Sequence, residues 1–452
     1  MAGAVGSGRD TDRRSVRATR PVYTGSAVAL LFAAIATGLA GGAQAQRPED
    51  VAGVRALSQQ PAVQRAFRII EELEPRTVED HIALTQVPAP PFQEAERAAV
   101  YMEWLRAAGA DSAFIDEEGN VIAVRRGRAG GRTVGFGGHL DTVFPEGTDV
   151  TVQQRGDTLF APGIGDDTRG LMVVLTVLRA LEESNIEMED DVWFVGVVGE
   201  EGLGDLRGMK HLFREGAHPI AAWIEVDGGG IDRIVNAGLG SHRYRPRFQG
   251  PGGHSWGAFG LANPAHALGR AIRHFVMDAD AITRDGPRTS YNVGTLEGGT
   301  SVNSIPFEAV MAVDMRSEDP ASLERIDSVF RRAMQKGLDE ENAARRSGPP
   351  LELVLEQVGD RPSGVMPPET PLVQRAIAAA TVMGAEPNLA VASTDSNVPI
   401  ARGVPAVTIG RGGVGGDGHA PTEWWMNRDG HLAIQNALLL LLAEAGIAAP
   451  AT

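Results

Sequence analysis

Hydrophobic residues recur at two spacings along the chain, and each spacing predicts a different kind of element. A helical period runs through Pro61–Thr85 and Glu94–Ala108, and Leu171–Leu181 has the composition of a strongly apolar helix. Short runs that are apolar or β-branched predict strands at Phe114–Asp116, Val121–Val124, Thr133–Gly138, Asp191–Val198 and Ala221–Val226. Strands that alternate with helices indicate an α/β unit, in which ligands bind beyond the carboxyl ends of the strands.

A second pattern fills residues 241–357. Strand-like segments at His242–Phe248, Val310–Arg316 and Leu351–Gln357 are combined with helical segments at Pro264–Phe275 and Pro320–Lys336. Their β-α-β-β-α-β order predicts a small α+β unit of the ferredoxin-like kind.

The first pattern returns after this stretch. The polar segment Asp339–Pro350 is expected to be a surface connection, and the helix Leu372–Met383 and the strand Ala406–Ile409 follow it. We therefore predict a catalytic α/β domain in two parts, residues 46–240 and 358–452, interrupted by an inserted domain at 241–357.

Residues 1–45 have the order of an export signal. Five arginines lie before Pro21, an apolar run covers Ala27–Ala40, and Ala43-Gln44-Ala45 resembles a cleavage site. No later stretch reaches the roughly 20 apolar residues of a membrane helix. We expect the protein to be exported, periplasmic or secreted, with no membrane segment in its mature form.

The amino-acid composition limits the kinds of site and partner that the protein can have. The 452 residues include 42 Lys+Arg and 58 Asp+Glu, for a net charge of −16, and no cysteine. The acidic balance argues against a nucleic-acid partner, because phosphate binding needs clustered lysine and arginine. The absence of cysteine excludes disulfides, thiol catalysis and thiolate metal sites.

Histidines and carboxylates gather at the predicted strand ends instead. The relevant residues are His139 and Asp141, the pair Asp166-Asp167, the pair Glu200-Glu201, Asp227 and His419. Taken singly, Asp167 could cap the following helix and the glutamates could form a solvated loop. Together, imidazole and carboxylate donors suit zinc, with manganese or cobalt as alternatives. Two ions that share a carboxylate can activate a water molecule.

This ordered set resembles the co-catalytic zinc exopeptidases and amidohydrolases related to peptidase T, glutamate carboxypeptidase and diaminopimelate desuccinylase. The resemblance covers roughly residues 65–445 and implies a mixed-sheet catalytic domain with an inserted lid or dimerisation domain. It implies two zinc ions per subunit. The implied ligands are His139 and Asp227 on one ion and Glu201 and His419 on the other, with Asp166 bridging.

The resemblance also implies roles around the metals. Glu200 would be the general base, and Asp141 would orient His139. The bridging position is open to two alignments. Counting from Pro162-Gly163 selects Asp166, which we prefer, whereas aligning Arg169-Gly170 with the family's Lys-Gly selects Asp167.

Further residues of the inserted domain resemble lid motifs. His254, in Gly252-Gly253-His254-Ser255, would stabilise the oxyanion in a neighbouring subunit of a homodimer, and Asn303 would bind substrate. Arg411 follows the strand Ala406–Ile409 and could pair with a substrate carboxylate, whereas Arg316 is interpreted as structural.

These features predict a metal-dependent exopeptidase acting on short peptides. Asp227 resembles the tripeptidase and dipeptidase branches of the family, which tend to have aspartate at this position, and that resemblance implies a peptide with a free amino terminus. A nearer alternative is an amidohydrolase or carboxypeptidase that cleaves N-acyl amino acids or other small amides. A more distant one is a metal-dependent binding module without catalysis, against which the proton-transfer residue Glu200 argues.

Overall fold

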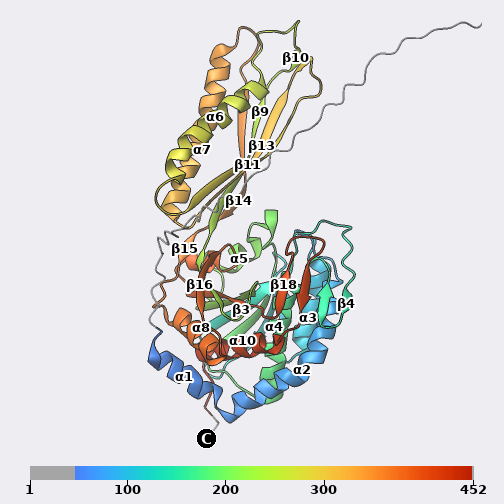
Figure 1. The fold of residues 1–452 in the computed structure, drawn as a ribbon, viewed down its shortest axis with the longest axis vertical. Helices are drawn as coiled ribbons and strands as arrows, with labels where there is room; N and C mark the ends of the chain where they lie inside the picture. Colours follow the sequence, from blue (N-terminus) through green and yellow to red (C-terminus); the bar gives the residue numbers. More distant parts are fainter. Residues whose placement is uncertain (1–45, 450–452) are drawn as a thin grey trace, which may run out of the picture. The chain divides into compact units, whose positions relative to one another are not determined.

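The computed structural model describes residues 46–449 (Figure 1). The predicted export signal at 1–45 lies outside the described residues, so export stays a prediction. None of the described helices combines the length and the apolar content that a membrane crossing requires.

A nine-stranded mixed sheet forms the centre of the larger part of the chain. Its main path runs in the order β1-β2-β6-β3-β7-β17-β8-β15, and β16 pairs with β8. The strands are β1 (Ser112–Ile115), β2 (Val121–Arg125), β3 (Thr133–His139), β6 (Asp191–Val197), β7 (Ala222–Asp227), β8 (Arg233–Gly238), β15 (Gly364–Val365), β16 (Asn388–Ala392) and β17 (Ala406–Gly410). Strands β6, β3, β7 and β17 run parallel to one another, which brings their carboxyl ends to one edge.

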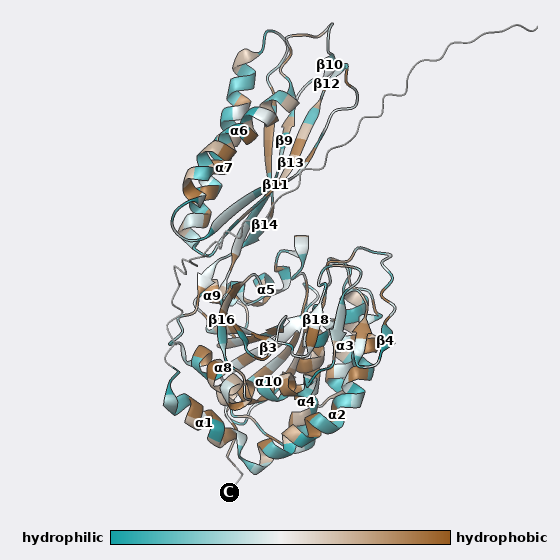
Figure 2. Ribbon diagram, viewed as in Figure 1, coloured by the Kyte–Doolittle hydropathy of each residue, from teal (hydrophilic) through white to brown (hydrophobic). Residues whose placement is uncertain are grey.

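Helices enclose this sheet and complete its hydrophobic core. They are α1 (Pro48–Ser58), α2 (Pro61–Thr85), α3 (Ala95–Ala107), α4 (Thr168–Ser184), α5 (Arg207–Leu212), α8 (Pro371–Val382), α9 (Asn397–Ala401) and α10 (Gly430–Ala445). Helix α4 packs on β3, β6 and β7, and α8 packs on β17 and β8. Helices α4 and α10 are buried on nearly every side, so their sequences are apolar on all faces, as Figure 2 shows for α10.

A second sheet with its own hydrophobic core lies between Gly240 and Arg361. Its strands β9 (Gly240–Gln249), β11 (Thr289–Gly298), β13 (Glu308–Ser317) and β14 (Glu352–Arg361) follow the spatial order β11-β13-β9-β14, with every pair antiparallel. Helices α6 (Pro264–Thr283) and α7 (Pro320–Ala344) pack against each other and on this sheet. This is the β-α-β-β-α-β arrangement that the sequence predicts.

Two smaller sheets complete the described structure. One pairs β10 (Gly253–His254) with β12 (Ser304–Ile305). The other has the order β18-β19-β5-β4 and joins β18 (Val414–Gly416), β19 (Trp424–Met426), β5 (Thr158–Phe160) and β4 (Gln153–Arg155).

The predicted α/β class with a mixed sheet is confirmed, and one local prediction is wrong. Residues 339–344 belong to α7 rather than to a surface connection. Glu341 within that turn is buried and accepts hydrogen bonds from the backbone of Asn263, at 3.0 Å, and from Arg270 Nε, at 3.1 Å. The polar composition of this turn therefore reflects a buried ion pair with α6 and not a loop.

The second core carries a buried histidine that links three elements. His242 of β9 lies 3.2 Å from Asp327 of α7 and 3.4 Å from Asp360 of β14. Burial alone would lower the pKa of His242, but its hydrogen bonds to the two carboxylates raise that pKa to about 9. Protonated His242 therefore stabilises the folded state.

The sign of the pH dependence follows from that raised pKa. The stabilisation is fully present below the unfolded value of 6.5 and is lost as the pH rises through about 9. We expect the difference in unfolding free energy between wild type and His242→Gln to shrink by about 1–3 kcal/mol across this window, with solvent at Asp360 screening part of the effect. Urea unfolding at several pH values measures the difference, and a pH-independent difference would contradict the assignment.

Candidate metal centre

The predicted site residues meet at the edge where the parallel strands end. His139 is the last residue of β3, Asp227 is the last residue of β7, and Glu200 and Glu201 follow shortly after β6. Because these three strands are parallel neighbours, their carboxyl ends lie together. Two loops from elsewhere in the chain add Asp166 and His419 to this edge.

The donors form three groups, of which His139, Glu200 and Glu201 are one, and the other two share a single residue. His139, Asp166 and Asp227 make one triad and Asp166, Glu201 and His419 the other, with the ligand atoms of each triad within 4.8 Å of one another. Asp166 presents its Oδ1 at 3.1 Å from His139 Nε2 and its Oδ2 at 3.3 Å from His419 Nε2. A carboxylate that offers one oxygen to each triad has the geometry of a bridging ligand.

Asp167 has a different environment. It is completely buried, caps α4 by accepting a hydrogen bond from the backbone of Gly170 at 3.2 Å, and accepts another from the backbone of His139 at 3.2 Å. It belongs to neither triad. The geometry therefore favours Asp166 over Asp167 as the shared ligand.

The ring of His139 is oriented by a backbone group. Its Nδ1 donates to the carbonyl oxygen of Asp141 at 2.9 Å, which leaves Nε2 facing Asp166. The carboxylate of Asp141 lies 3.7 Å from the ring and instead accepts the backbone N–H groups of Glu200, at 3.0 Å, and Glu201, at 2.8 Å. Asp141 therefore contacts His139 as predicted, but the hydrogen bond runs through its backbone carbonyl, and its carboxylate fixes the loop of the two glutamates.

The electrostatics of the centre suit a cation. Burial by itself would lower the pKa of His139, but hydrogen bonding to Asp166 and the surrounding carboxylates raise it well above its usual range. Hydrogen bonds to Asp166 and Glu201 raise the pKa of His419 to about 10. Burial would raise the pKa of Asp166, yet the two imidazoles hold it well below its ordinary value. Imidazoles and carboxylates therefore interact strongly at this site, and a metal ion on the same donors would compete with protons for the imidazole nitrogens.

Arg411 lies among these ligands and not at a free substrate position. Its Nη1 is 3.5 Å from Asp166 Oδ1 and 3.6 Å from Asp227 Oδ1, and its side chain is largely buried. A guanidinium already engaged by two carboxylates is a poor anchor for a substrate carboxylate. The sequence-based assignment of Arg411 to substrate binding is therefore not supported, and we assign its charge to the acidic ligands.

Arg361, which the sequence patterns did not reveal, contacts the predicted general base. It ends β14 and is 4% exposed. Its Nη1 lies 3.0 Å from Glu200 Oε1 and 2.9 Å from Ser393 Oγ, and its Nη2 donates to the Glu200 carbonyl oxygen. The predicted strand Leu351–Gln357 stopped four residues short of it. Burial raises the pKa of Glu200 well above its usual range, and Arg361 opposes that rise.

A cleft of about 350 Å³ opens onto the centre. Its lining comprises Val143, Asp166, Glu200, Glu201, Gly202, Asp227, Arg243, Arg316, Arg361, Ser393 and His419. Arg316 pairs with Asp314 at 2.8 Å, as its structural interpretation requires, but it also faces this cleft.

The two predicted lid residues are placed elsewhere in the described chain. His254 of β10 is exposed, and its Nδ1 accepts backbone N–H groups from Trp256 at 3.2 Å and Gly257 at 3.3 Å. Asn303 is exposed and accepts a hydrogen bond from Ser301 Oγ at 2.6 Å. Neither residue lines the cleft at the metal centre within the described part of this chain.

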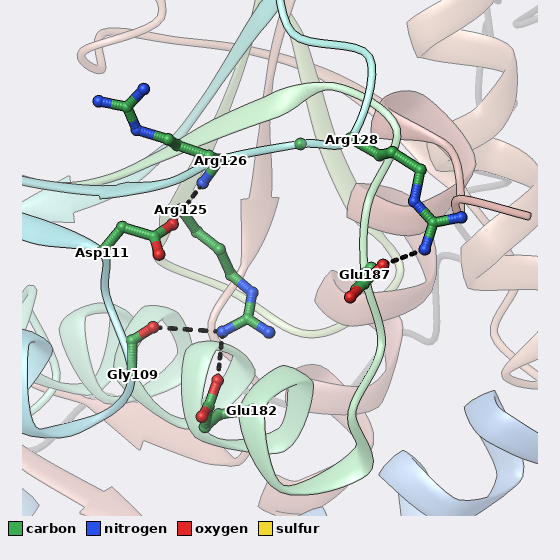
Figure 3. A pocket seen from close by; sticks show the side chains of 8 residues that line it. Gly109, Asp111, Arg125, Arg126, Arg128, Glu182 and Glu187 are labelled. Atoms are coloured by element: carbon green, nitrogen blue, oxygen red, sulfur yellow. Dashed lines mark hydrogen bonds and ion pairs between the residues drawn. The ribbon is translucent and has the colours of Figure 1, made fainter. Parts of the chain in front are cut away.

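A larger cleft of about 490 Å³ lies near the opposite edge of the sheet, where β6 begins (Figure 3). Two of its arginine side chains are paired with acids, since Arg125 is 2.7 Å from Glu182 and Arg128 pairs with Glu187. The contact of Arg126 with Asp111, at 2.7 Å, is made by its backbone N–H. The 350 Å³ cleft is the candidate active site because the metal-ligand triads line it.

Comparison with known proteins agrees with the site. Residues 135–444 match the sequence model of "Peptidase family M20/M25/M40". The chain is 26% identical over 332 residues to carboxypeptidase G2 of a Pseudomonas species, covering 71% of this chain and 75% of that protein. It is 25% identical over 363 residues to protein YqjE of Bacillus subtilis, covering 75% of this chain and 91% of that protein.

Solved structures share the fold. Aminopeptidase PepT of Bacillus cereus superposes with a TM-score of 0.62 at 23% identity, over 82% of this chain and 97% of that one. The dipeptidase Dug1p of Saccharomyces cerevisiae superposes with a TM-score of 0.66 at 16% identity, over 85% of this chain and 99% of that one.

The two neighbouring aspartates provide a matched test of the bridging assignment. We expect Asp166→Asn to lose zinc from both triads, because each triad includes that carboxylate. Asp167→Asn should keep zinc and lower the free energy of unfolding by at most about 1 kcal/mol, since asparagine also caps helices. The zinc content of dialysed protein, measured by mass spectrometry, checks both variants. Zinc retained by Asp166→Asn and lost by Asp167→Asn would select the other alignment.

Proposed function

Because this chain belongs to Peptidase family M20/M25/M40, and is thus a hydrolase of peptide or amide bonds, we propose that it is a di-zinc exopeptidase acting on short peptides. The observation that carries the proposal is the position of Asp166 between two metal-ligand triads, with Glu200 beside them. The donor set of two imidazoles and three carboxylates, without thiolate, fits zinc and also allows manganese or cobalt.

Each residue of the site has a separate role in the proposed reaction. Two zinc ions on these ligands would supply an acidified water and a polarised scissile carbonyl. Glu200 accepts the proton of the attacking water and returns it to the leaving amine. Burial raises the pKa of Glu200, Arg361 opposes that rise, and Arg361 Nη1 lies 3.0 Å from Glu200 Oε1.

A second candidate is an N-acyl amino acid amidohydrolase or a carboxypeptidase that uses the same groups. The similarity to carboxypeptidase G2 at 26% identity supports the carboxypeptidase, and the folds of PepT and Dug1p are compatible with a peptide that has a free amino terminus. Both candidates keep Glu200 as general base and differ in the group on the acyl side of the bond.

The place of His254 supports a homodimer as part of the proposal. The histidine lies at an exposed turn that also carries Trp256, 88% exposed, and Phe259, 71% exposed. Large exposed apolar side chains are typical of association surfaces. In a dimer formed through this domain, His254 would enter the cleft of the other subunit and stabilise the oxyanion, with Asn303 binding substrate.

A substrate panel tests the proposed function. Di- and tripeptides are compared with N-acyl amino acids, each in the presence of zinc, manganese or cobalt, and amine release is measured. We expect turnover of short peptides with a free amino terminus, because hydrolysis at the chain end fits a cleft of about 350 Å³. Preferential turnover of the acylated compounds would instead select the second candidate.

Glu200→Gln is the catalytic control for this panel. It preserves shape and leaves intact the two triads that share Asp166, so we expect bound zinc to be retained and kcat to fall by at least about 10²-fold. Absence of turnover by wild type across the panel, with two ions bound, would point to a binding protein.

Complementation tests the shared active site. Glu200→Gln and His254→Ala should each be nearly inactive alone. If His254 acts in the other subunit, mixed dimers contain one site with both residues, and random exchange should restore about a quarter of wild-type activity. Activity that stays at the level of the separate variants, although mass spectrometry detects mixed dimers, would place His254 outside the reaction.

A further inference from the structure

We propose that Glu423 is a positioning residue that joins the loop of the bridging ligand Asp166 to the loop of His419. The inference rests on the proposed di-zinc function and adds a residue to which no role has been given above. Glu423 lies four residues after His419, at the point where that loop enters β19.

The carboxylate of Glu423 is occupied by three backbone donors of a single loop. Its Oε2 accepts the N–H of Gly163 at 2.8 Å, and its Oε1 accepts the N–H groups of Gly165 and Asp166, both at 2.9 Å. The last of these donors belongs to the shared ligand itself. Glu423 is 2% exposed, so these bonds form in a water-poor environment where charge-assisted hydrogen bonds are strong.

The loop of Gly163–Asp166 and the carboxylate of Glu423 are in close contact at Gly165. A Cβ atom on Gly165 would lie 2.9 Å from Glu423 Oε1 and 2.9 Å from Arg411 Nη2. Glycine at position 165 is therefore what allows the carboxylate to approach the backbone so closely. The other side of the loop is held by His81, whose Nε2 donates to the carbonyl of Ile164 at 2.5 Å.

The main chain of Glu423 completes the connection to the second metal-ligand loop. Its N–H donates to the carbonyl of Ala420 at 3.0 Å, and its carbonyl accepts the N–H of Ala161 at 3.1 Å. One residue thus contacts the turn that follows His419 and the segment that leads to Asp166. These loops carry the two ligands whose relative position defines the second triad.

A bridging carboxylate requires more positional accuracy than a terminal ligand, because both of its oxygens must fit simultaneously. Metal sites tolerate deviations of roughly 0.5 Å before they weaken. The three backbone N–H groups that donate to this one buried carboxylate restrict the position of the loop. Glu423 therefore acts on the metals through Asp166 and His419, and not by ligation.

Glu423→Gln tests this role. The amide keeps the shape but directs an NH₂ group at backbone donors, which leaves at least one N–H group without an acceptor. Losing such a supporting contact typically weakens metal binding about 10–100-fold. Zinc affinity of the full chain is measured by competition with a chelator, and the visible spectrum of the cobalt-substituted protein reports ligand geometry. We expect weaker zinc binding, a changed cobalt spectrum, and a fall in kcat larger than any change in KM.

Two further variants complete the experiment. Glu386→Gln makes the same chemical change at an exposed surface position and should leave zinc affinity and activity unchanged. Gly165→Ala perturbs the contact from the other loop and should weaken zinc in the same direction, which provides a second test if Glu423→Gln folds poorly.

The outcomes separate the inference from its premise. If wild type binds two zinc ions and Glu423→Gln binds them equally well with an unchanged cobalt spectrum and only a lower melting temperature, Glu423 is a structural brace and the inference is wrong. If wild type itself binds fewer than two ions, the proposed di-zinc function fails, and the inference fails with it.

Discussion

Burial of like charges at one edge of a sheet is the constraint that shapes this structure. Parallel strands bring Asp227 and Glu200-Glu201 beside the loop of Asp166, where desolvation and mutual repulsion both disfavour ionised carboxylates. Each acid must therefore find a compensating group. Backbone N–H groups serve Asp141, Asp167 and Glu423, and guanidinium groups serve Glu200 and the aspartates near Arg411.

Some acids remain without such compensation. Both carboxylate oxygens of Asp395 and one oxygen of Glu225 have no hydrogen-bond partner among the described residues, and both residues are buried. Burial raises the pKa of Asp395 to about 8 and that of Glu225 well above its usual range. These two carboxyl groups therefore contrast with Asp166, whose pKa is held low by the two imidazoles beside it.

Strand ends were the strongest signal in the sequence. Because the hydrophobic runs before His139, Glu200 and Asp227 are continuous, their direction and burial could be predicted, and the acids that follow them had to share an edge. Arg361 could not be found this way, since its significance depends on β14 extending four residues beyond its apolar segment. The role of the Asp141 carboxylate could not be predicted from the sequence either. The local spacing placed it beside His139, and only the fold brings the backbone of Glu200 and Glu201 to it.

The inserted segment contributes to the site through direct contacts. Arg243 of β9 donates to the carbonyl of Gly202 at 2.6 Å, next to the ligand Glu201, and Arg361 of β14 holds Glu200. Arg243 and Arg316 share the carboxylate of Asp314, which aligns both guanidinium groups on adjacent strands. The loop that carries Glu200 and Glu201 is consequently fixed from two sides, by Asp141 just after β3 and by arginines of the second sheet.

The acids occur in adjacent pairs, and the two members of each pair have different contacts. In the first pair, Asp166 faces the imidazoles and Asp167 caps α4. In the second pair, Glu201 faces His419 and Glu200 pairs with Arg361. One member of each pair is available to a metal ion because its neighbour directs the backbone through contacts with the protein. A lone ligand on either loop would lack that second attachment. The doubled carboxylate is therefore a structural requirement for placing the ligand as well as an element of the chemistry.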